Sequence, residues 1–361
     1  MMRTVLNGEH RRLGATLVEF AGWEMPLSYT GIVAEALAVR QAAGLFDVSH
    51  MGVIEVRGAS ARLDLERLVT RALHDLPEGR ARYALLLNSR GGILDDLFVY
   101  SLAPDCLWVV ANAANAERDC RWIAERVNEG VQVTWRLGEI AILALQGPRA
   151  VAVATAATGL EFAPLRRFGF LRWSLEGQEV LTSRTGYTGE DGLEFFCPVG
   201  IAETLWRRLL EAGHGAGVVP CGLGARDVLR IEAGNVLYGH EINEDTGPVE
   251  ANLMWAVDLA KGDFIGREAV LNACAVPPAR CLVGLAMEER AIPRQGAPVG
   301  TDDAPTGVVT SGTFSPTLNQ AIALAYLPPA EAVPDRPAWI ELRGRRRQAR
   351  VTALPFIRRH G

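Results

Sequence analysis

A hairpin signal places the strongest constraint on the fold of this chain. Residues 83–87 and 93–100 have the composition and alternation of strands, and residues 88–92 between them contain two glycines. Such a short connection joins antiparallel neighbours, whereas parallel strands need a crossover of a dozen or more residues. A third strand-like run at 106–110 and a helical pattern at 114–127 follow. The order predicts an α+β fold with antiparallel sheets.

The length and the changing texture of the chain predict more than one domain. Its 361 residues exceed what a single hydrophobic core usually serves. Beyond about Ala279 the pattern becomes short strand-like runs broken by glycine and proline, with no helical periodicity. This texture is typical of a small β-barrel or β-sandwich, so we expect a separate C-terminal domain over residues 279–361.

Two local expectations concern the first fifty residues. The stretch before Ile32 shows no clear periodicity and is expected to be irregular. A helical pattern then runs over residues 32–43, and Gly44 is expected to stop that helix.

Composition excludes several classes of function. The net charge of −5 gives no electrostatic footprint for nucleic acid. No apolar run is long enough to span a membrane, so no membrane association is expected. The six cysteines are dispersed without a Cys-x-x-Cys pair, and the six histidines have no metal-ligand spacing. We therefore expect reduced thiols, a cytoplasmic location and no metal.

The first candidate site is the acidic strand at residues 91–100. Asp95 and Asp96 are adjacent, but neighbouring side chains on a strand point to opposite faces, which argues against a shared-proton pair. Alternation places Asp96 on one face with Phe98 and Tyr100. One carboxylate flanked by two aromatic rings suits a flat ligand that carries an amine. A strand-end aspartate that caps a turn is an equally good interpretation of this segment alone.

The second candidate is the glycine-rich segment 183–195, which ends at Glu194. Glycines allow a backbone to approach a ligand closely, although they also simply form turns. A carboxylate at Glu194 could accept two parallel N–H bonds from a ring edge such as that of a pterin. An ordinary surface glutamate is the alternative.

The third candidate is the helical pattern at residues 224–234. The preceding glycines do not match a dinucleotide-binding loop, because the third glycine is missing. Arg226 and Arg230 are four residues apart and share a helix face. They could hold a carboxylate-bearing tail or an internal acid such as Glu194, or they could form ion pairs with Asp227 and Glu232.

An ordered set of short segments extends along essentially the whole chain. Two of the segments are Gly91-Gly92-Ile93-Leu94-Asp95-Asp96 and Leu145-Gln146-Gly147-Pro148. The others lie at residues 14–15, 20–26, 38–40, 44–52, 186–192, 222–227, 237–239 and 310–318. Each segment alone is weakly specific, but in this collinear order they resemble one family, the T protein of the glycine cleavage system, an aminomethyltransferase.

The resemblance implies a three-domain cloverleaf around a central folate channel. Residues 1–278 would form two interleaved α+β domains, the second at roughly 52–138. The implied reaction converts aminomethyl-lipoyl H protein and tetrahydrofolate into 5,10-methylenetetrahydrofolate, ammonia and dihydrolipoyl H protein. H protein would be the partner, tetrahydrofolate the co-substrate, and the enzyme would be a monomer without a metal.

The resemblance also assigns site residues. The catalytic aspartate of the family falls on Asp96. The family's folate contacts fall on Tyr83, Asp96, Phe98, Tyr100, Tyr187, Glu194 and Arg226.

The chain departs from the family pattern at three places. His240-Glu241 replaces the usual Gln-Asp, Asn252 replaces a usual glycine, and no tyrosine follows Pro355-Phe356 near the C-terminus.

Two rival functions belong to the wider superfamily. A non-catalytic folate-binding maintenance protein would carry a cysteine where this chain has Asp263, which argues against it. A folate-dependent demethylase of a small methylated compound is the stronger rival, because fold does not fix function.

Overall fold

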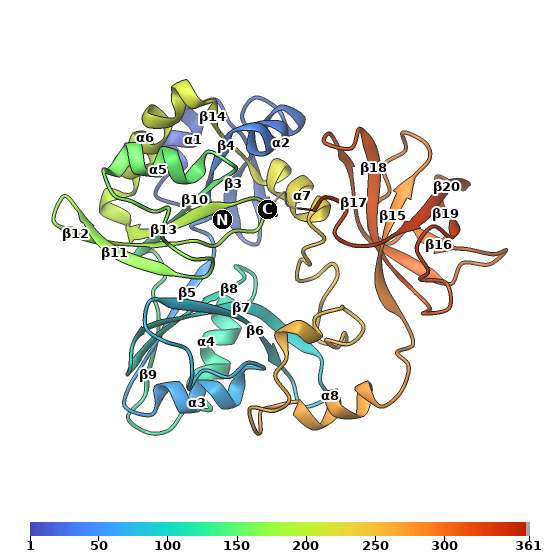
Figure 1. The fold of residues 1–361 in the computed structure, drawn as a ribbon, viewed down its shortest axis with the longest axis horizontal. Coiled ribbons are helices and arrows are strands. Elements are labelled where there is room, and N and C mark those ends of the chain that lie inside the picture. Colours follow the sequence, from blue (N-terminus) through green and yellow to red (C-terminus); the bar gives the residue numbers. More distant parts are fainter. Residues whose placement is uncertain (359–361) are drawn as a thin grey trace. The chain divides into compact units, whose positions relative to one another are not determined.

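The computed structural model describes residues 1–358, and its strands form three open sheets and one closed barrel (Figure 1). Most of the strand pairs are antiparallel, and helices accompany the open sheets, so the predicted α+β class is confirmed. The chain divides into two units. Unit 1 contains residues 1–66, 73–83 and 97–226, and unit 2 contains residues 67–72, 84–96 and those from 227 onward.

A six-stranded sheet forms the centre of unit 1. Its order is β11 (Phe170–Leu175), β12 (Gln178–Ser183), β13 (Gly192–Pro198), β10 (Ile140–Gln146), β4 (Ala43–Asp47) and β14 (Val218–Pro220). Helices α5 (Ala150–Thr158) and α6 (Val199–Gly213) lie against one face (Figure 1), where Leu143, Phe195 and Trp206 are fully buried in one apolar core. Because side chains alternate along a strand, residues that neighbour Phe195 on β13 point to the opposite face.

Strand β4 corrects the prediction for Gly44. Helix α2 (Ile32–Gln41) ends before this glycine, which lies inside β4 rather than at a helix stop. A Cβ atom at Gly44 would come within 2.5 Å of both Cys221 Sγ and Val39 Cγ2. Close packing of α2 and the segment after β14 therefore requires glycine here, a tertiary cause that local pattern cannot show.

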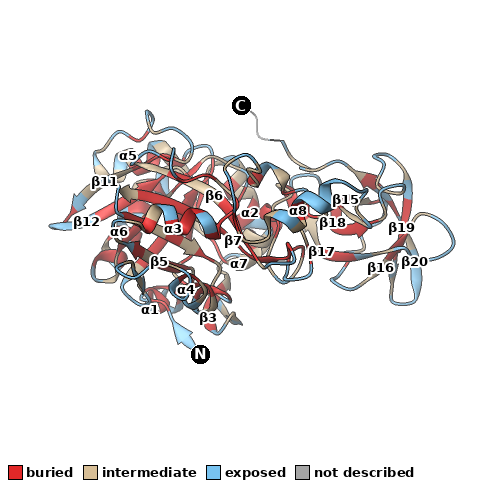
Figure 2. Cartoon of the chain, turned by 90° about the horizontal axis from the view of Figure 1, so that it is seen from below, coloured by how far each residue is buried: buried red, intermediate tan, exposed pale blue. Residues whose placement is uncertain are grey.

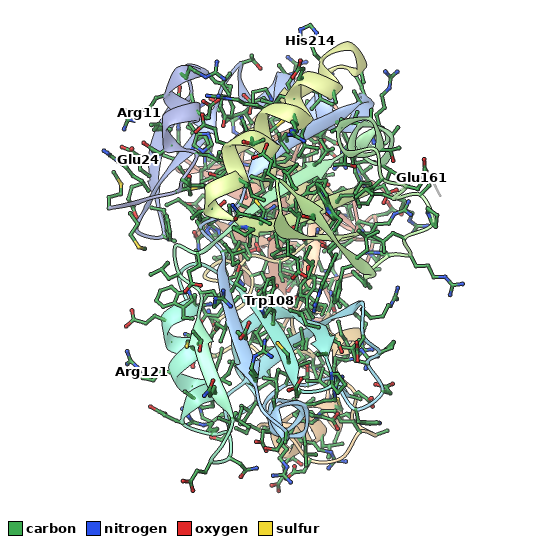
Figure 3. All side chains as sticks on the ribbon, turned by 90° about the vertical axis from the view of Figure 1, so that its left-hand side faces the viewer. Arg11, Glu24, Trp108, Arg121, Glu161 and His214 are labelled. Atoms are coloured by element: carbon green, nitrogen blue, oxygen red, sulfur yellow. The ribbon has the colours of Figure 1, made fainter. Side chains whose placement is uncertain are left out.

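The prediction that the stretch before Ile32 is irregular was wrong. It contains β1 (Met2–Arg3), α1 (Asn7–Arg12), β2 (Thr16–Phe20) and β3 (Trp23–Ser28), and the three strands form a small sheet. Arg11 on α1 forms an ion pair with Glu24 on β3 at 2.5 Å (Figure 3). The strands are short and only partly buried, so their period-2 signal is weak.

A five-stranded sheet contains the hairpin that constrained the prediction. Its order is β6 (Arg80–Leu87), β7 (Ile93–Ala103), β8 (Cys106–Ala111), β5 (Gly52–Arg57) and β9 (Gln132–Trp135), accompanied by helices α3 (Ala61–Leu68) and α4 (Ala116–Ala124). The two strands at residues 83–87 and 93–100 are confirmed as neighbours in this sheet. Part of β6 and part of β7 belong to each unit.

The C-terminal strands of unit 2 close into a barrel. They are β15 (Cys281–Met287), β18 (Gln320–Leu327), β17 (Gly307–Ser315), β16 (Pro298–Gly300), β19 (Pro337–Leu342) and β20 (Arg345–Thr352). Buried residues follow these strands (Figure 2), and Leu285, Val299 and Ile340 are among the core residues with no exposed surface. The predicted barrel is confirmed. Helices α7 (Leu223–Glu232) and α8 (Arg267–Cys274) precede it.

No helix within residues 1–358 is both long and apolar enough to cross a membrane.

Candidate functional site

Three of the predicted site residues form an aromatic cluster in unit 1. The ring centroid of Tyr83 lies 5.4 Å from that of Phe98, and Phe98 lies 6.3 Å from Tyr100. Tyr100 is 1% exposed and also packs edge-on against Phe196 at 5.2 Å. The cluster provides the apolar surface on which a flat ring could stack.

Burial along β7 alternates from Asp95 to Val99. Asp95, Leu97 and Val99 are buried, whereas Asp96 and Phe98 are only partly buried. Tyr100, on the same face as Asp96, departs from the alternation because it is buried against Phe196. This pattern agrees with two faces on which the adjacent carboxylates diverge.

A hydrogen-bond chain connects the aromatic cluster to Glu194. The Tyr100 hydroxyl lies 3.3 Å from the Thr185 hydroxyl oxygen, and the Thr185 hydroxyl donates to the Glu194 carboxylate. Glu194 lies on β13 beside Phe195, so it points away from the face that α5 and α6 cover. Burial raises the pKa of Glu194, while the Thr185 hydrogen bond and the charge of Arg226 oppose that rise.

Arg226 completes the group in unit 1. Its guanidinium carbon lies 4.6 Å above the ring centroid of Tyr187, a cation–π arrangement. Burial lowers the pKa of Arg226, and the negative charge of Glu194 acts in the opposite direction. Its Nη1 atom is buried and has no hydrogen-bond partner among residues 1–358. A buried guanidinium nitrogen without a partner is suited to donate to a ligand.

Arg230, which the sequence could not separate from Arg226, has a structural role. It is 1% exposed and bonds to Asp227 at 2.8 Å, Glu241 at 2.7 Å and Ser311 at 2.7 Å. The ion-pair interpretation therefore holds for Arg230 with Asp227. Glu241, one of the departures from the family pattern, is its fully buried partner.

The loop between β12 and β13 is held by contacts that the sequence did not single out. The buried Gln146 side chain donates to the Thr185 carbonyl at 3.1 Å and accepts from the Thr188 hydroxyl at 3.0 Å. Arg184 binds Asp191 through two hydrogen bonds of 3.0 and 2.5 Å. Gln146 belongs to the Leu-Gln-Gly-Pro segment, whose only signal was the family resemblance.

Asp47 has a structural role. Its carboxylate accepts from Thr4 at 2.6 Å and lies 2.8 Å from Nε2 of His10, and the Ser49 amide also donates to it. Burial opposes ionisation, but these bonds outweigh it and lower the pKa of Asp47. The side chain of His50 does not join this network.

The sequence predicts no metal site. Within residues 1–358, no three His, Cys, Asp or Glu side chains converge in a way that could hold a metal ion. His360 lies outside the described residues.

Family models match most of the chain. The GCVT N-terminal domain matches residues 6–261, and the glycine cleavage T-protein C-terminal barrel domain matches residues 280–357. An aminomethyltransferase of Symbiobacterium thermophilum is 46% identical and covers 99% of this chain and 98% of its own. One from Prosthecochloris aestuarii is 44% identical, over 99% of this chain and 100% of its own.

A solved structure agrees with these matches over nearly the full length. The crystal structure of glycine cleavage system aminomethyltransferase T from Bartonella henselae has a TM-score of 0.92 and 40% identity, and covers 98% of each chain. The chain therefore belongs to the glycine cleavage T-protein family, and it is an aminomethyltransferase.

Proposed function

We propose that this chain transfers the aminomethyl group of lipoylated H protein to tetrahydrofolate. The products are 5,10-methylenetetrahydrofolate, ammonia and dihydrolipoyl H protein. The observation that carries the proposal is the match of both the N-terminal and the barrel regions to one enzyme family along nearly the whole chain.

Unit 1 supports a pterin site around Glu194. A pterin ring presents N3–H and a 2-amino group as adjacent donors, with a carbonyl oxygen next to N3. Glu194 is a carboxylate with acceptor capacity left after its bond to Thr185. The partnerless Nη1 of Arg226 supplies a donor of the kind that the carbonyl oxygen needs. The proposed contacts of Tyr83, Phe98, Tyr100 and Tyr187 are ring packing, as suits their aromatic neighbours.

Asp96 is the proposed catalytic residue. It precedes Phe98 by two positions on β7, so strand alternation gives both side chains the same direction. Loss of ammonia from the S–CH2–NH3+ group of the carrier leaves an electrophilic carbon stabilised by the sulfur, which one folate nitrogen attacks with loss of its proton. Departure of the lipoyl thiolate then lets the second folate nitrogen attack the same carbon, which closes the methylene bridge and releases dihydrolipoyl H protein. A carboxylate close to that nitrogen would orient the amine, accept its proton and stabilise the passing cation.

H protein as the partner and a cytoplasmic location are part of the same proposal. The free state of all six cysteines supports a reducing compartment. We also propose that the protein is a monomer, with a C-terminal domain at residues 279–361 and a second domain at roughly 52–138.

The experiment offers different one-carbon donors to the purified full chain and compares the products. Aminomethylated H protein and tetrahydrofolate should give methylenetetrahydrofolate and ammonia in equal amounts. Asp96→Asn should lower kcat by about a hundredfold or more, the usual contribution of a positioned proton acceptor, while tetrahydrofolate still binds. Near-normal turnover of this variant would refute the role of Asp96. Methyltetrahydrofolate formed from a small methylated donor, with no reaction of H protein, would instead support a demethylase.

A further inference from the structure

His50 is a buried histidine that the proposed reaction does not use. Only 4% of its surface is exposed, and the ring of Phe20 packs edge-on against it at 5.6 Å. Its Nδ1 atom is buried and has no hydrogen-bond partner among residues 1–358. Because folded proteins rarely leave a buried polar atom unsatisfied, this nitrogen requires an explanation.

Arg226 also has a buried nitrogen, Nη1, without a hydrogen-bond partner among residues 1–358. The topology brings the segment that contains His50 and the segment that contains Arg226 to one edge of the six-stranded sheet. Strands β4 and β14 pair in parallel, with Leu45 opposite Pro220, so both leave the sheet in the same direction. The amide of Cys221, just after β14, donates to the carbonyl of Leu45 at 2.9 Å. His50 follows the end of β4 by three residues, and Arg226 lies in the first turn of the helix after β14.

The charge state of His50 suits a neighbouring cation. Burial, and to a smaller extent the charge of Arg226, lower its pKa to about 4, against the opposing effect of Asp47. The imidazole is therefore neutral at pH 7. A neutral imidazole offers one donor and one acceptor nitrogen, so Nδ1 can accept when Nε2 carries the proton.

We propose that His50 is a positioning residue for Arg226. Nη1 of Arg226 donates to a single buried water, and that water donates to Nδ1 of His50. Two otherwise unsatisfied groups at one edge of a sheet provide the polar partners that such a water needs. Nη1 carries two hydrogens, so the bridge uses one of them, fixes the guanidinium over Tyr187, and leaves the other oriented for the carbonyl oxygen of the pterin ring. This step rests on the proposed function, because it takes tetrahydrofolate as the ligand of Arg226.

Two isosteric substitutions test which nitrogen matters. The side-chain oxygen of asparagine can take the place of Nδ1, and that of glutamine can take the place of Nε2. His50→Gln should raise KM for tetrahydrofolate about tenfold, the size expected for losing one hydrogen bond to a charged group, with kcat within about twofold. His50→Asn should keep most of the affinity of the unmodified chain for tetrahydrofolate. Equal losses in both variants, or a fall in kcat alone, would overturn the proposal.

A double-mutant cycle tests the coupling directly. Arg226→Lys removes the planar guanidinium that the bridge holds. In that background His50→Gln should therefore raise KM for tetrahydrofolate by less than about a further twofold. Fully additive losses would contradict the bridge.

Equilibrium dialysis of the full chain with tetrahydrofolate separates the two hypotheses. If the unmodified chain binds no tetrahydrofolate, the proposed function fails. The same four proteins then test the bridge by their urea midpoints, where non-additive shifts support it and additive shifts overturn it.

Discussion

At the scale of single residues, Asn252 shows why one departure from the family pattern is tolerated. Its backbone φ is +57°, in the left-handed region that favours glycine, and asparagine is among the side chains that accept it best. Its side-chain amide also donates to the Leu282 carbonyl at 2.7 Å. The glycine usual in the family and the asparagine found here therefore meet the same backbone requirement.

This conformation predicts opposite outcomes for two substitutions. Asn252→Val places a β-branched residue at positive φ and should destabilise the protein by about 1–2 kcal/mol or more. Asn252→Gly keeps the conformation and loses one hydrogen bond, so it should cost about 1 kcal/mol or less. Urea unfolding followed by circular dichroism measures both. A valine variant as stable as the glycine variant would contradict the conformational argument.

The buried imidazole of His50 predicts a pH dependence of stability. Its pKa falls from 6.5 to about 4 on folding, so the unfolded chain takes up the proton first as the pH falls. The stability that the neutral ring contributes is present above pH 6.5 and is lost on the way down through about pH 4, roughly 3 kcal/mol in total.

Urea midpoints between pH 7 and pH 4 test this dependence. His50→Asn should flatten the decline, whereas His214→Asn, at an exposed position, serves as the control and should leave it unchanged. The depressed pKa of Asp47 contributes at lower pH, because its stabilisation is lost only below its ordinary value of 3.8. An unchanged slope in His50→Asn would show that the ring does not titrate in this way.

At the scale of elements, the loop between β12 and β13 depends on Gln146. Gln146→Leu would leave the Thr188 hydroxyl and the Thr185 carbonyl without their buried partner. We expect a loss of roughly 2–4 kcal/mol in stability and a raised KM for tetrahydrofolate, because Thr185 also holds Glu194. Gln178→Leu, at an exposed position on β12, is the matched control and should change neither quantity. If both variants behave alike, the loop does not depend on this amide.

Local pattern predicted those elements whose burial alternates or recurs at helical spacing. The strands at residues 83–87 and 93–100 were predicted from such a pattern, and both are present in the five-stranded sheet. Gly44 was misread, because the close approach of Cys221 and Val39 that requires glycine comes from distant parts of the chain. Thr185 was missed as the residue that links Tyr100 to Glu194 for the same reason, since a hydroxyl beside glycines looks like any turn residue.

At the scale of the whole molecule, the barrel has the properties of an independently folding domain. Its six strands close on themselves, which leaves no open edge, and they surround a core of their own. Two side chains in the segment before the barrel form hydrogen bonds with barrel residues. Arg230 donates to the Ser311 hydroxyl, and the Thr310 hydroxyl donates to Glu241. Removing that segment exposes polar groups that water can satisfy, so it should lower stability without removing the core.

We therefore predict that residues 279–361 fold when expressed alone. The fragment should show a cooperative thermal transition by circular dichroism and dispersed amide resonances, with a lower melting temperature than the barrel in the full chain. Val299→Asp places a carboxylate in the fully buried core and should abolish the transition, because no partner compensates its desolvation. Val308→Asp, at a position that is 37% exposed, should preserve it. A fragment that shows no cooperative transition would mean that the barrel depends on the segment before it, and the domain boundary would then lie upstream of residue 279.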